Sequence, residues 1–205
     1  MIELYKNHPS LKICEKDIEN AFSLLCETYE NKGKILLCGN GGSSADCDHI
    51  TGELMKGFLL QRKMPELLKK FEALGYDDAA YMAHNLQGAL PAISLPHQSA
   101  LISAFANDVA ADMVYAQLVY GFADKNDALI CISTSGNSKN VVYAAKTAKM
   151  LGIKTIALTG KNESALSELC NVSIKVPEHE TYRIQELHLP VYHYLCAKIE
   201  DKFFA

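Results

Sequence analysis

The sequence lacks the features that mark several large classes of protein. No apolar run is long enough to span a bilayer. Residues 1–21 contain no apolar core of a signal peptide, so we expect a cytoplasmic protein. Basic residues are not in excess, since the net charge is −4 and the isoelectric point is about 6.0. That balance gives no electrostatic reason to expect binding to nucleic acid or to an anionic membrane.

Paired cysteines are also lacking, although cysteine itself is plentiful. The chain has seven cysteines, an odd number, and no CxxC pair. They are scattered along the chain, and most stand inside apolar runs. This pattern favours buried, reduced thiols over disulfide bonds or a zinc cluster.

The chain does contain a regular alternation of apolar strands and helices. Its 205 residues, 49% apolar and 21% charged, are enough for one domain with a substantial core. Strands are predicted at residues 35–38, 89–95, 127–133, 154–160 and 171–177. Helices are predicted at residues 10–31, 98–106, 110–122, 139–151, 163–170 and 181–203, with another after the first strand and a charged helical segment at 62–87. Strands that are apolar throughout predict a five-stranded parallel sheet covered on both faces, a three-layer α/β/α sandwich.

A glycine-rich turn follows the first strand. The run Gly39-Asn40-Gly41-Gly42-Ser43-Ser44 fits neither a dinucleotide fingerprint nor a Walker A loop. A tight strand-to-helix turn and an anion site at a helix N-terminus both explain it. On the helix that follows, His49 and Glu53 are four residues apart and therefore share one face. The turn and this pair together indicate the start of an active site.

A second polar loop follows the strand predicted at 127–133. The run Ser133-Thr134-Ser135-Gly136-Asn137-Ser138 carries four hydroxyls and one carboxamide at the start of a helix. Such a loop can wrap phosphate oxygens with backbone N–H and hydroxyl groups, without any lysine or arginine. Helix capping explains one serine but not the whole set. The loop therefore favours a phosphate site, and ligands of open α/β sheets bind at such strand ends.

The helix predicted at 181–203 has a polar face with two interpretations. Gln185 and His193 lie eight residues apart, on one face of that helix. A solvated face with a partly satisfied histidine is the simpler interpretation of these residues alone. Pro190 removes a backbone hydrogen bond inside the helix and is expected to kink it.

Taken together, these motifs resemble the sugar isomerase (SIS) domain family. The segments that carry the resemblance are CGNGGS, His49-x-x-x-Glu53, Asn107-Asp108, STSGNS, LTGK and RIQELH-x-x-x-x-H, in that order. They are most similar to the phosphoheptose isomerase branch, whose members convert sedoheptulose 7-phosphate into D-glycero-D-manno-heptose 7-phosphate. The resemblance implies a flavodoxin-like SIS fold in a single domain over residues 1–205. Within it, residues 1–33 would hold an N-terminal helix, residues 60–88 a helical insertion and residues 181–205 a C-terminal helix.

The resemblance also implies which residues form the site. The substrate phosphate would be held by Ser133, Thr134, Ser135 and Ser138. The sugar chain would be contacted by Asn40, Gly41, Gly42, Glu53, Asn107, Asp108 and Gln185. A zinc ion would be held by His49, Glu53, Gln185 and His193, which replaces the simpler interpretation of the last helix. Members of the family form homotetramers with sites completed by neighbouring subunits, so we expect the same assembly here.

The implied chemistry agrees with the residue types. Aldose–ketose isomerisation moves a proton between C1 and C2 of the sugar through an enediolate. It needs a carboxylate base, an acid for the oxygen and stabilisation of the developing negative charge. Glu53 is the predicted base and His193 the predicted acid. Zinc, with nitrogen and oxygen ligands, would polarise the carbonyl.

The chain departs from the phosphoheptose isomerase pattern at two positions near the base. Gly52 stands where an acidic residue usually precedes Glu53, and Gly57 stands where an arginine usually follows, four residues later. Lys56 is the candidate substitute for that arginine. The helical insertion lies beside the same helix and would reshape the pocket.

Two other functions compete with the isomerase. A non-catalytic SIS-domain adaptor, similar to the protein that binds the bacterial replication initiator, would keep the fold and the glycine loop. Such adaptors lose the base glutamate, whereas this chain retains Glu53 and His193. A phosphosugar-sensing regulator is less favoured, because the sequence has no helix-turn-helix segment and no basic face. The sequence therefore favours the isomerase.

Overall fold

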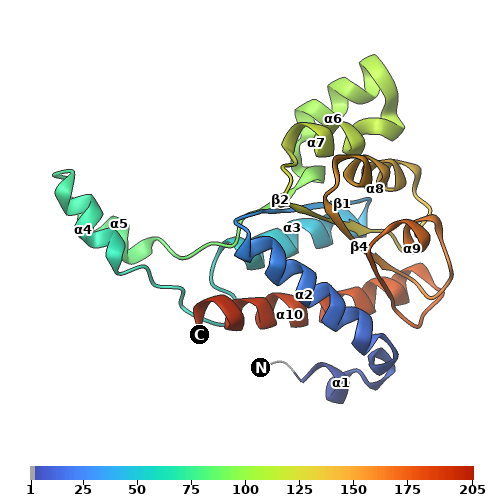
Figure 1. Ribbon diagram of the computed structural model, residues 1–205, viewed down its shortest axis with the longest axis horizontal. Helices are drawn as coiled ribbons and strands as arrows, with labels where there is room; N and C mark the ends of the chain where they lie inside the picture. The colour runs from blue at the N-terminus through green and yellow to red at the C-terminus, as the bar shows by residue number, and fades with distance from the viewer. Residues whose placement is uncertain (1–2) are drawn as a thin grey trace.

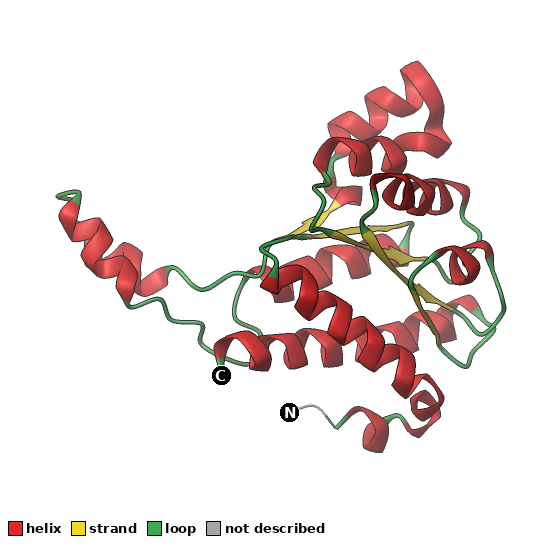
Figure 2. Ribbon diagram, in the orientation of Figure 1, coloured by secondary structure: helices red, strands yellow, loops and turns green. Residues whose placement is uncertain are grey.

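A five-stranded parallel sheet forms the centre of the computed structural model, which describes residues 3–205. The strands are β1 (Ile35–Gly39), β2 (Ala92–Ser94), β3 (Ala128–Ile132), β4 (Lys154–Thr159) and β5 (Val172–Lys175). Their order in the sheet is β2-β1-β3-β4-β5, and each neighbouring pair is parallel. The predicted α/β fold with a five-stranded parallel sheet is therefore confirmed (Figure 2).

Two groups of helices cover the two faces of the sheet. Alternate side chains of a strand point to opposite faces, so Leu37 packs into one core and Leu36 into the other. The first face is covered by α2 (Glu15–Glu30), α3 (Gly42–Met55) and α10 (Thr181–Phe204). The second face is covered by α7 (Val114–Phe122), α8 (Lys139–Leu151) and α9 (Ala165–Leu169). In Figure 1, α2 and α10 lie below the sheet, while α7 and α8 lie above it.

The predicted boundaries differ most where prolines interrupt the backbone. The strand predicted at 89–95 is only Ala92–Ser94, because Pro91 has no N–H for the sheet and a 3-10 turn, η2 (Leu95–His97), begins before Pro96. The helix predicted at 10–31 begins as the 3-10 turn η1 (Pro9–Cys14), which follows the single helical turn α1 (Leu4–Asn7). The helix α8 matches its predicted range and ends at Gly152, whose φ is 75°. The helix α10 continues through Pro190 without a break.

Asn107 and Asp108 lie inside a helical run, although they were expected between two helices. The run consists of α6 (Ser99–Phe105) and the π-helical turn η3 (Ala106–Ala110). The extended backbone of Ala110 then separates it from the 3-10 turn η4 (Ala111–Met113), which leads into α7. Single π-helical turns are frequent at functional sites. This one projects both side chains from a helix surface and not from a loop.

The segment predicted to be charged and helical, residues 62–87, forms a helical hairpin. Its helices are α4 (Glu66–Ala73) and α5 (Ala79–Asn85). Figures 1 and 2 show this hairpin standing away from the sheet and its covering helices. An antiparallel bridge between Lys63 and Gln87 joins its two ends.

A buried ion pair ties the base of the hairpin to α3 and α10. Arg62 Nε donates to Glu200 Oε1 over 2.8 Å, and the two side chains are 0% and 1% exposed. The same guanidinium donates to the carbonyl oxygens of Glu53, over 2.9 Å, and Leu54, over 2.6 Å. These carbonyls belong to the last turn of α3, where no further helical N–H is available to them. Arg62 therefore fixes the end of α3 against α10.

Glu200 is satisfied by backbone donors as well as by Arg62. Its carboxylate accepts hydrogen bonds from the N–H groups of Phe58, Leu59 and Leu60, at 2.7, 2.7 and 3.1 Å. Burial alone would raise the pKa of Glu200, but the backbone donors and the Arg62 guanidinium outweigh burial and hold the pKa below its usual range. The pair is thus a fully hydrogen-bonded charge pair, the arrangement in which a buried ion pair is tolerated.

Two further expectations concern the cysteines and the membrane. All seven cysteines are free, and six of them are buried, which agrees with the expectation of reduced thiols. Among residues 3–205, no helix has the length and apolar character needed to cross a membrane.

Replacing Arg62 by methionine is expected to destabilise the fold by about 3–5 kcal/mol, because Glu200 would remain buried without its charged partner. The matched control is Lys12→Met, since Lys12 and Glu15 form an exposed ion pair, 63% and 42% exposed. Such pairs contribute roughly 0–1 kcal/mol. Denaturant unfolding followed by circular dichroism measures both variants. Equal small losses in the two variants would mean that the buried pair does not hold α3 and α10 together.

Candidate active site

The helices α3 and α10 bring three predicted site residues together. His49 and Glu53 lie on one face of α3, with His49 Nε2 at 3.4 Å from Glu53 Oε1. His193 of α10 faces them, with its Nε2 at 3.4 Å from His49 Nε2. The two imidazole rings meet edge to face, with centroids 4.9 Å apart. Residues more than 140 positions apart in the sequence thus form one polar cluster.

Gln185 lies at the start of α3 and not beside His49. Gly42 opens α3, and a Cβ on it would stand 2.4 Å from Gln185 Nε2. The missing side chain of Gly42 is what allows the Gln185 carboxamide to pack against the glycine turn. The structure therefore brings Gln185 to Gly42, while His49 lies about two turns farther along α3.

Glu53 combines partial burial with an uncommitted oxygen. Its side chain is 13% exposed, and its Oε2 lies 3.5 Å from Lys56 Nζ. Within residues 3–205, that oxygen is buried without a hydrogen-bond partner. A carboxylate oxygen with free lone pairs in a protected site is suited to accept a proton.

His193 is adjusted toward the neutral form. Burial lowers the pKa of His193, the neighbouring His49 lowers it further, and Glu53 opposes the shift. A neutral imidazole keeps one N–H donor and can still polarise a substrate oxygen. His188, on the same helix, is no part of this cluster, because it is fully buried with Nε2 at 3.4 Å from the Thr159 carbonyl oxygen. Burial lowers the pKa of His188 to about 4, so it stays neutral.

The loop from Ser133 to Ser138 is ordered by its own hydroxyls. Ser133 Oγ and Ser138 Oγ are 3.1 Å apart, and the Asn137 N–H donates to Ser135 Oγ over 3.2 Å. Gly136 has a φ of 65°, and a Cβ there would stand 2.1 Å from Ser164 Oγ, so only glycine fits. The loop leads directly into α8, whose N-terminal N–H groups favour an anion.

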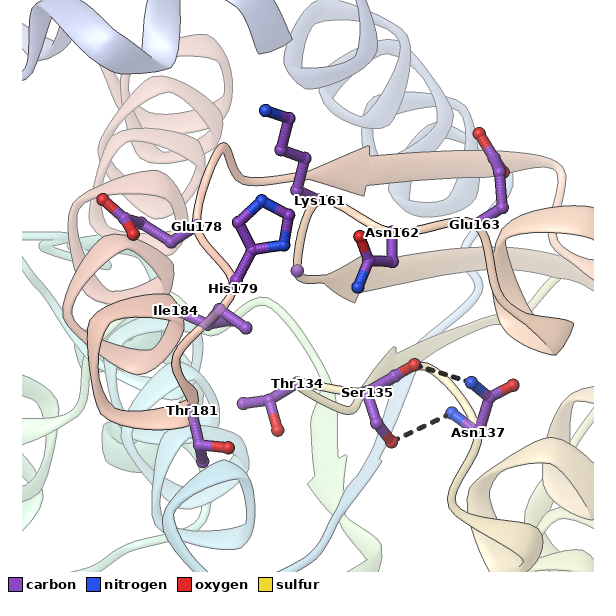
Figure 3. A pocket seen from close by; sticks show the side chains of 11 residues that line it. Thr134, Ser135, Asn137, Lys161, Asn162, Glu163, Glu178, His179, Thr181 and Ile184 are labelled. Atoms are coloured by element: carbon purple, nitrogen blue, oxygen red, sulfur yellow. Dashed lines mark hydrogen bonds between the residues drawn. The ribbon is translucent and has the colours of Figure 1, made fainter.

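A cavity of about 310 Å³ opens beside this loop (Figure 3). Its wall is formed by Thr134, Ser135, Asn137, Gly160, Lys161, Asn162, Glu163, Glu178, His179, Thr181 and Ile184. Ile184 is the neighbour of Gln185 in α10, so the cavity reaches the helix that carries two predicted zinc ligands. Lys161 belongs to the LTGK segment of the resemblance, but no role in the site was predicted for it.

The glycine turn and the serine loop are joined by an amide pair. Asn40 Nδ2 donates to Asn140 Oδ1 over 2.9 Å, and Asn140 Nδ2 donates to Asn40 Oδ1 over 2.8 Å. This pair holds the end of β1 against the start of α8. Asn140 was not predicted, and a polar residue at the second position of the helix after the serine loop is the only signal for it.

Asn107 and Asp108 are not brought into the cluster. Both are exposed, and Asn107 Nδ2 donates to Asp108 Oδ1 over 2.8 Å. In Figure 1 their helical run lies on the side of the sheet opposite α10. Within one chain, these two residues are therefore separated from the His49 cluster.

The predicted zinc set is assembled only in part. His49 lies 3.4 Å from a ligand atom of both Glu53 and His193, and two ligands of a tetrahedral zinc, each bonded at about 2.0–2.1 Å, are about 3.4 Å apart. In residues 3–205, however, no three His, Cys, Asp or Glu side chains form a group ready to hold a metal ion. The donors fit zinc pairwise, and rotation of side chains would be needed to close the set.

Known proteins match this chain over most of its length. The SIS domain is the family description that matches, over residues 11–73 and 78–160. A phosphoheptose isomerase from a Nitratiruptor species is 40% identical over 182 residues, covering 88% of this chain and 84% of that protein. One from a strain of Helicobacter pylori is 39% identical over 194 residues, covering 95% of this chain and 88% of that protein.

Solved structures of the same class have the same fold. A phosphoheptose isomerase from Neisseria gonorrhoeae superposes with a TM-score of 0.76 at 30% identity, covering 95% of this chain and 91% of the other. One from Francisella tularensis gives a TM-score of 0.77 at 29% identity, covering 96% and 94%. The chain therefore belongs to the SIS domain family and, within it, to the phosphoheptose isomerase branch.

Proposed function

We propose that this chain is an isomerase that interconverts sedoheptulose 7-phosphate and D-glycero-D-manno-heptose 7-phosphate. The observation that carries the proposal is the meeting of Glu53, His49 and His193 where α3 packs against α10. The names of the relatives, which are 35–41% identical, support the choice of a heptose phosphate. The reaction is a proton transfer, and the cluster contains a base and a neutral acid for it.

Glu53 is the proposed base. It removes the proton from the carbon next to the carbonyl and returns a proton to the neighbouring carbon, which converts the ketose into the aldose. Its uncommitted Oε2 supplies the lone pair, and its 13% exposure limits competition from water. The carbonyl oxygen gains negative charge as the enediolate forms, so it needs a donor at that moment.

His193 is the proposed donor to that oxygen. Because its pKa is lowered, the ring is neutral near pH 7 and donates through one N–H. The pKa of a neutral imidazole is closer to the pKa of the enediol than the pKa of an imidazolium is. A neutral His193 is therefore suited to share its proton with the enediolate oxygen.

The serine loop is the proposed phosphate site. Ser133, Thr134, Ser135 and Ser138 offer neutral donors at the N-terminus of α8, and Lys161 adds a positive charge at the wall of the neighbouring cavity. Asn40, Gly41 and Gly42 form the turn from β1 into α3, where Asn40 bonds Asn140 at the start of α8 and Gln185 packs against Gly42. They are therefore proposed to contact the sugar chain.

Zinc is the proposed cofactor. His49, Glu53, Gln185 and His193 would hold it, and the two 3.4 Å separations at His49 support that choice. When bound, zinc would supply a Lewis acid for the substrate carbonyl. The protein's own residues still carry the proton transfer between the carbons.

The proposed assembly is a homotetramer in which neighbouring subunits share sites. Asn107 and Asp108 support it, because they are exposed in the single chain and follow α6, on the other side of the sheet from α10, yet they match a motif of the family. In the assembly they would reach the sugar bound by a neighbouring subunit.

Glu53→Gln is expected to lower kcat by at least about 10³-fold, because the carboxamide cannot accept the proton. The melting temperature should stay unchanged, since Gln has nearly the same shape. Glu186→Gln, an exposed position on α10, is the matched control and should keep full activity. The assay follows aldose formation from sedoheptulose 7-phosphate and from a panel of other ketose phosphates. Binding of phosphosugars with no turnover of any of them would favour the adaptor and contradict the isomerase.

Ser135→Ala is expected to raise KM by roughly 10-fold with little change in kcat, because it removes one hydroxyl donor to a charged phosphate. Ser135 Oγ already accepts from the Asn137 N–H, so its own proton is free to donate. Ser103→Ala serves as control, since that hydroxyl is exposed and bonds only to the Ala100 carbonyl oxygen of its own helix. An unchanged KM for Ser135→Ala would remove this hydroxyl from the phosphate site.

Removal of metal by a chelator is expected to abolish activity, and zinc added back in equal molar amount should restore it. Zinc content is measured by elemental analysis before and after treatment. Magnesium serves as the control cation, because it prefers six oxygen ligands and does not suit two imidazoles. Full activity in a preparation shown to contain no zinc would refute the cofactor.

A further inference from the structure

Tyr192, the residue before His193 on α10, connects the cluster to a second carboxylate. Its ring is buried, and its hydroxyl oxygen lies 3.0 Å from His49 Nδ1 and 3.2 Å from Asp46 Oδ1. The rings of Tyr192 and His49 meet edge to face, with centroids 5.4 Å apart. Asp46 is three residues before His49, so both side chains are on the same side of α3. No role of the predicted chemistry uses Asp46 or Tyr192.

The number of protons decides how these three groups bond. A tyrosine hydroxyl has one proton, and an ionised carboxylate can only accept. A tyrosine hydroxyl has an ordinary pKa of about 10, so it keeps that proton at neutral pH. Asp46 Oδ2 is buried without a hydrogen-bond partner among the described residues, which leaves Tyr192 as the donor to this carboxylate. If the hydroxyl turned to His49 instead, the carboxylate would lose that donor, at a cost of about 1–3 kcal/mol or more for a charged group.

We propose that Tyr192, held by Asp46, is a positioning residue that fixes His49 in the tautomer with its proton on Nδ1. With the hydroxyl proton directed to Asp46, the Tyr192 oxygen accepts the Nδ1–H of His49. The other nitrogen, Nε2, then carries a lone pair and faces Glu53 Oε1 and His193 Nε2, each at 3.4 Å.

This choice of tautomer has a consequence for Glu53. In the opposite tautomer, His49 Nε2–H would donate to Glu53 and weaken the carboxylate as a base. With Nε2 unprotonated, Glu53 keeps its lone pairs, and His49 can accept the N–H of His193 or bind a cation. The hydrogen bonds from His49 to Tyr192 and from Tyr192 to Asp46 are called the relay below. The importance of the relay for catalysis rests on the proposed isomerase function, whereas the tautomer of His49 does not.

The test reads the tautomer directly in the protein freed of metal. Long-range proton–nitrogen NMR of protein labelled with ¹⁵N-histidine, recorded at about pH 8, distinguishes the two ring nitrogens of neutral imidazoles. The resonances of His49 are identified by their loss in His49→Gln. We expect a protonated Nδ1 and an unprotonated Nε2 in the wild-type protein. In Tyr192→Phe, which removes only the hydroxyl, we expect the Nε2–H form to appear.

Tyr194→Phe is the matched control. Tyr194 lies two residues farther along α10, and its hydroxyl donates to Glu19 Oε1 over 3.3 Å, away from His49. This variant should keep the wild-type tautomer and the wild-type kcat. Tyr192→Phe should lower kcat by roughly 10–100-fold, the usual effect of removing such an outer partner, with KM changed far less.

The outcomes separate the relay from the proposed function. A wild-type His49 that is protonated on Nε2 overturns the relay, as does a Tyr192→Phe spectrum identical to that of the wild type. The wild-type spectrum decides the question even if Tyr192→Phe fails to fold. An active isomerase with the Nε2–H form would refute the relay alone. A protein with the Nδ1–H form that turns over no phosphosugar would refute the isomerase and leave the relay standing.

Discussion

The close packing of α3 against α10 is the constraint on which the site depends. The helix α3 carries His49 and Glu53, and α10 carries His193. A shift of one helix along the other by one turn, about 5.4 Å, would separate these residues. The Arg62–Glu200 pair prevents such a shift, because the guanidinium bonds the Glu53 carbonyl and the Glu200 carboxylate at once. Glu53 thus carries the proposed base on its side chain and binds Arg62 of the ion pair through its backbone carbonyl. The same pair anchors the base of the helical hairpin.

The chemistry of the cluster follows from burial and from the direction of a few protons. Burial and a second imidazole keep His193 neutral, and Glu53 retains an oxygen with free lone pairs. In the proposed arrangement Tyr192 adds the remaining constraint, because it determines which nitrogen of His49 carries the proton. The proposed phosphate site uses neutral donors, the N-terminus of α8 and the charge of Lys161, so recognition of the charged end would be separated from proton transfer.

Much of this could be predicted from residues that share one element. Helical periodicity predicted that His49 and Glu53 share one face of their helix, and that Gln185 and His193 share one face of the last helix. For the last helix the spacing indicated only a polar face, and its role in the site came from the resemblance to the SIS family. Contacts between elements were not accessible in this way. Arg62 belongs to the segment predicted to be charged and helical, yet it is fully buried, and no pattern in the sequence distinguished Tyr192. The strand Ala92–Ser94 was predicted to be longer. Prolines near both of its ends limit strand pairing, and an apolar pattern does not reveal this effect.

The central claim is that Glu53 moves a proton between two sugar carbons at the junction of α3 and α10. Incubation of the wild-type protein with sedoheptulose 7-phosphate in deuterated water tests it most directly, because a base that removes a carbon-bound proton exchanges it with solvent. Proton NMR should show deuterium at C1 of the ketose and at C2 of the aldose product, and neither signal should change in Glu53→Gln. Absence of deuterium at both carbons in the wild-type protein, together with no aldose, would contradict the account.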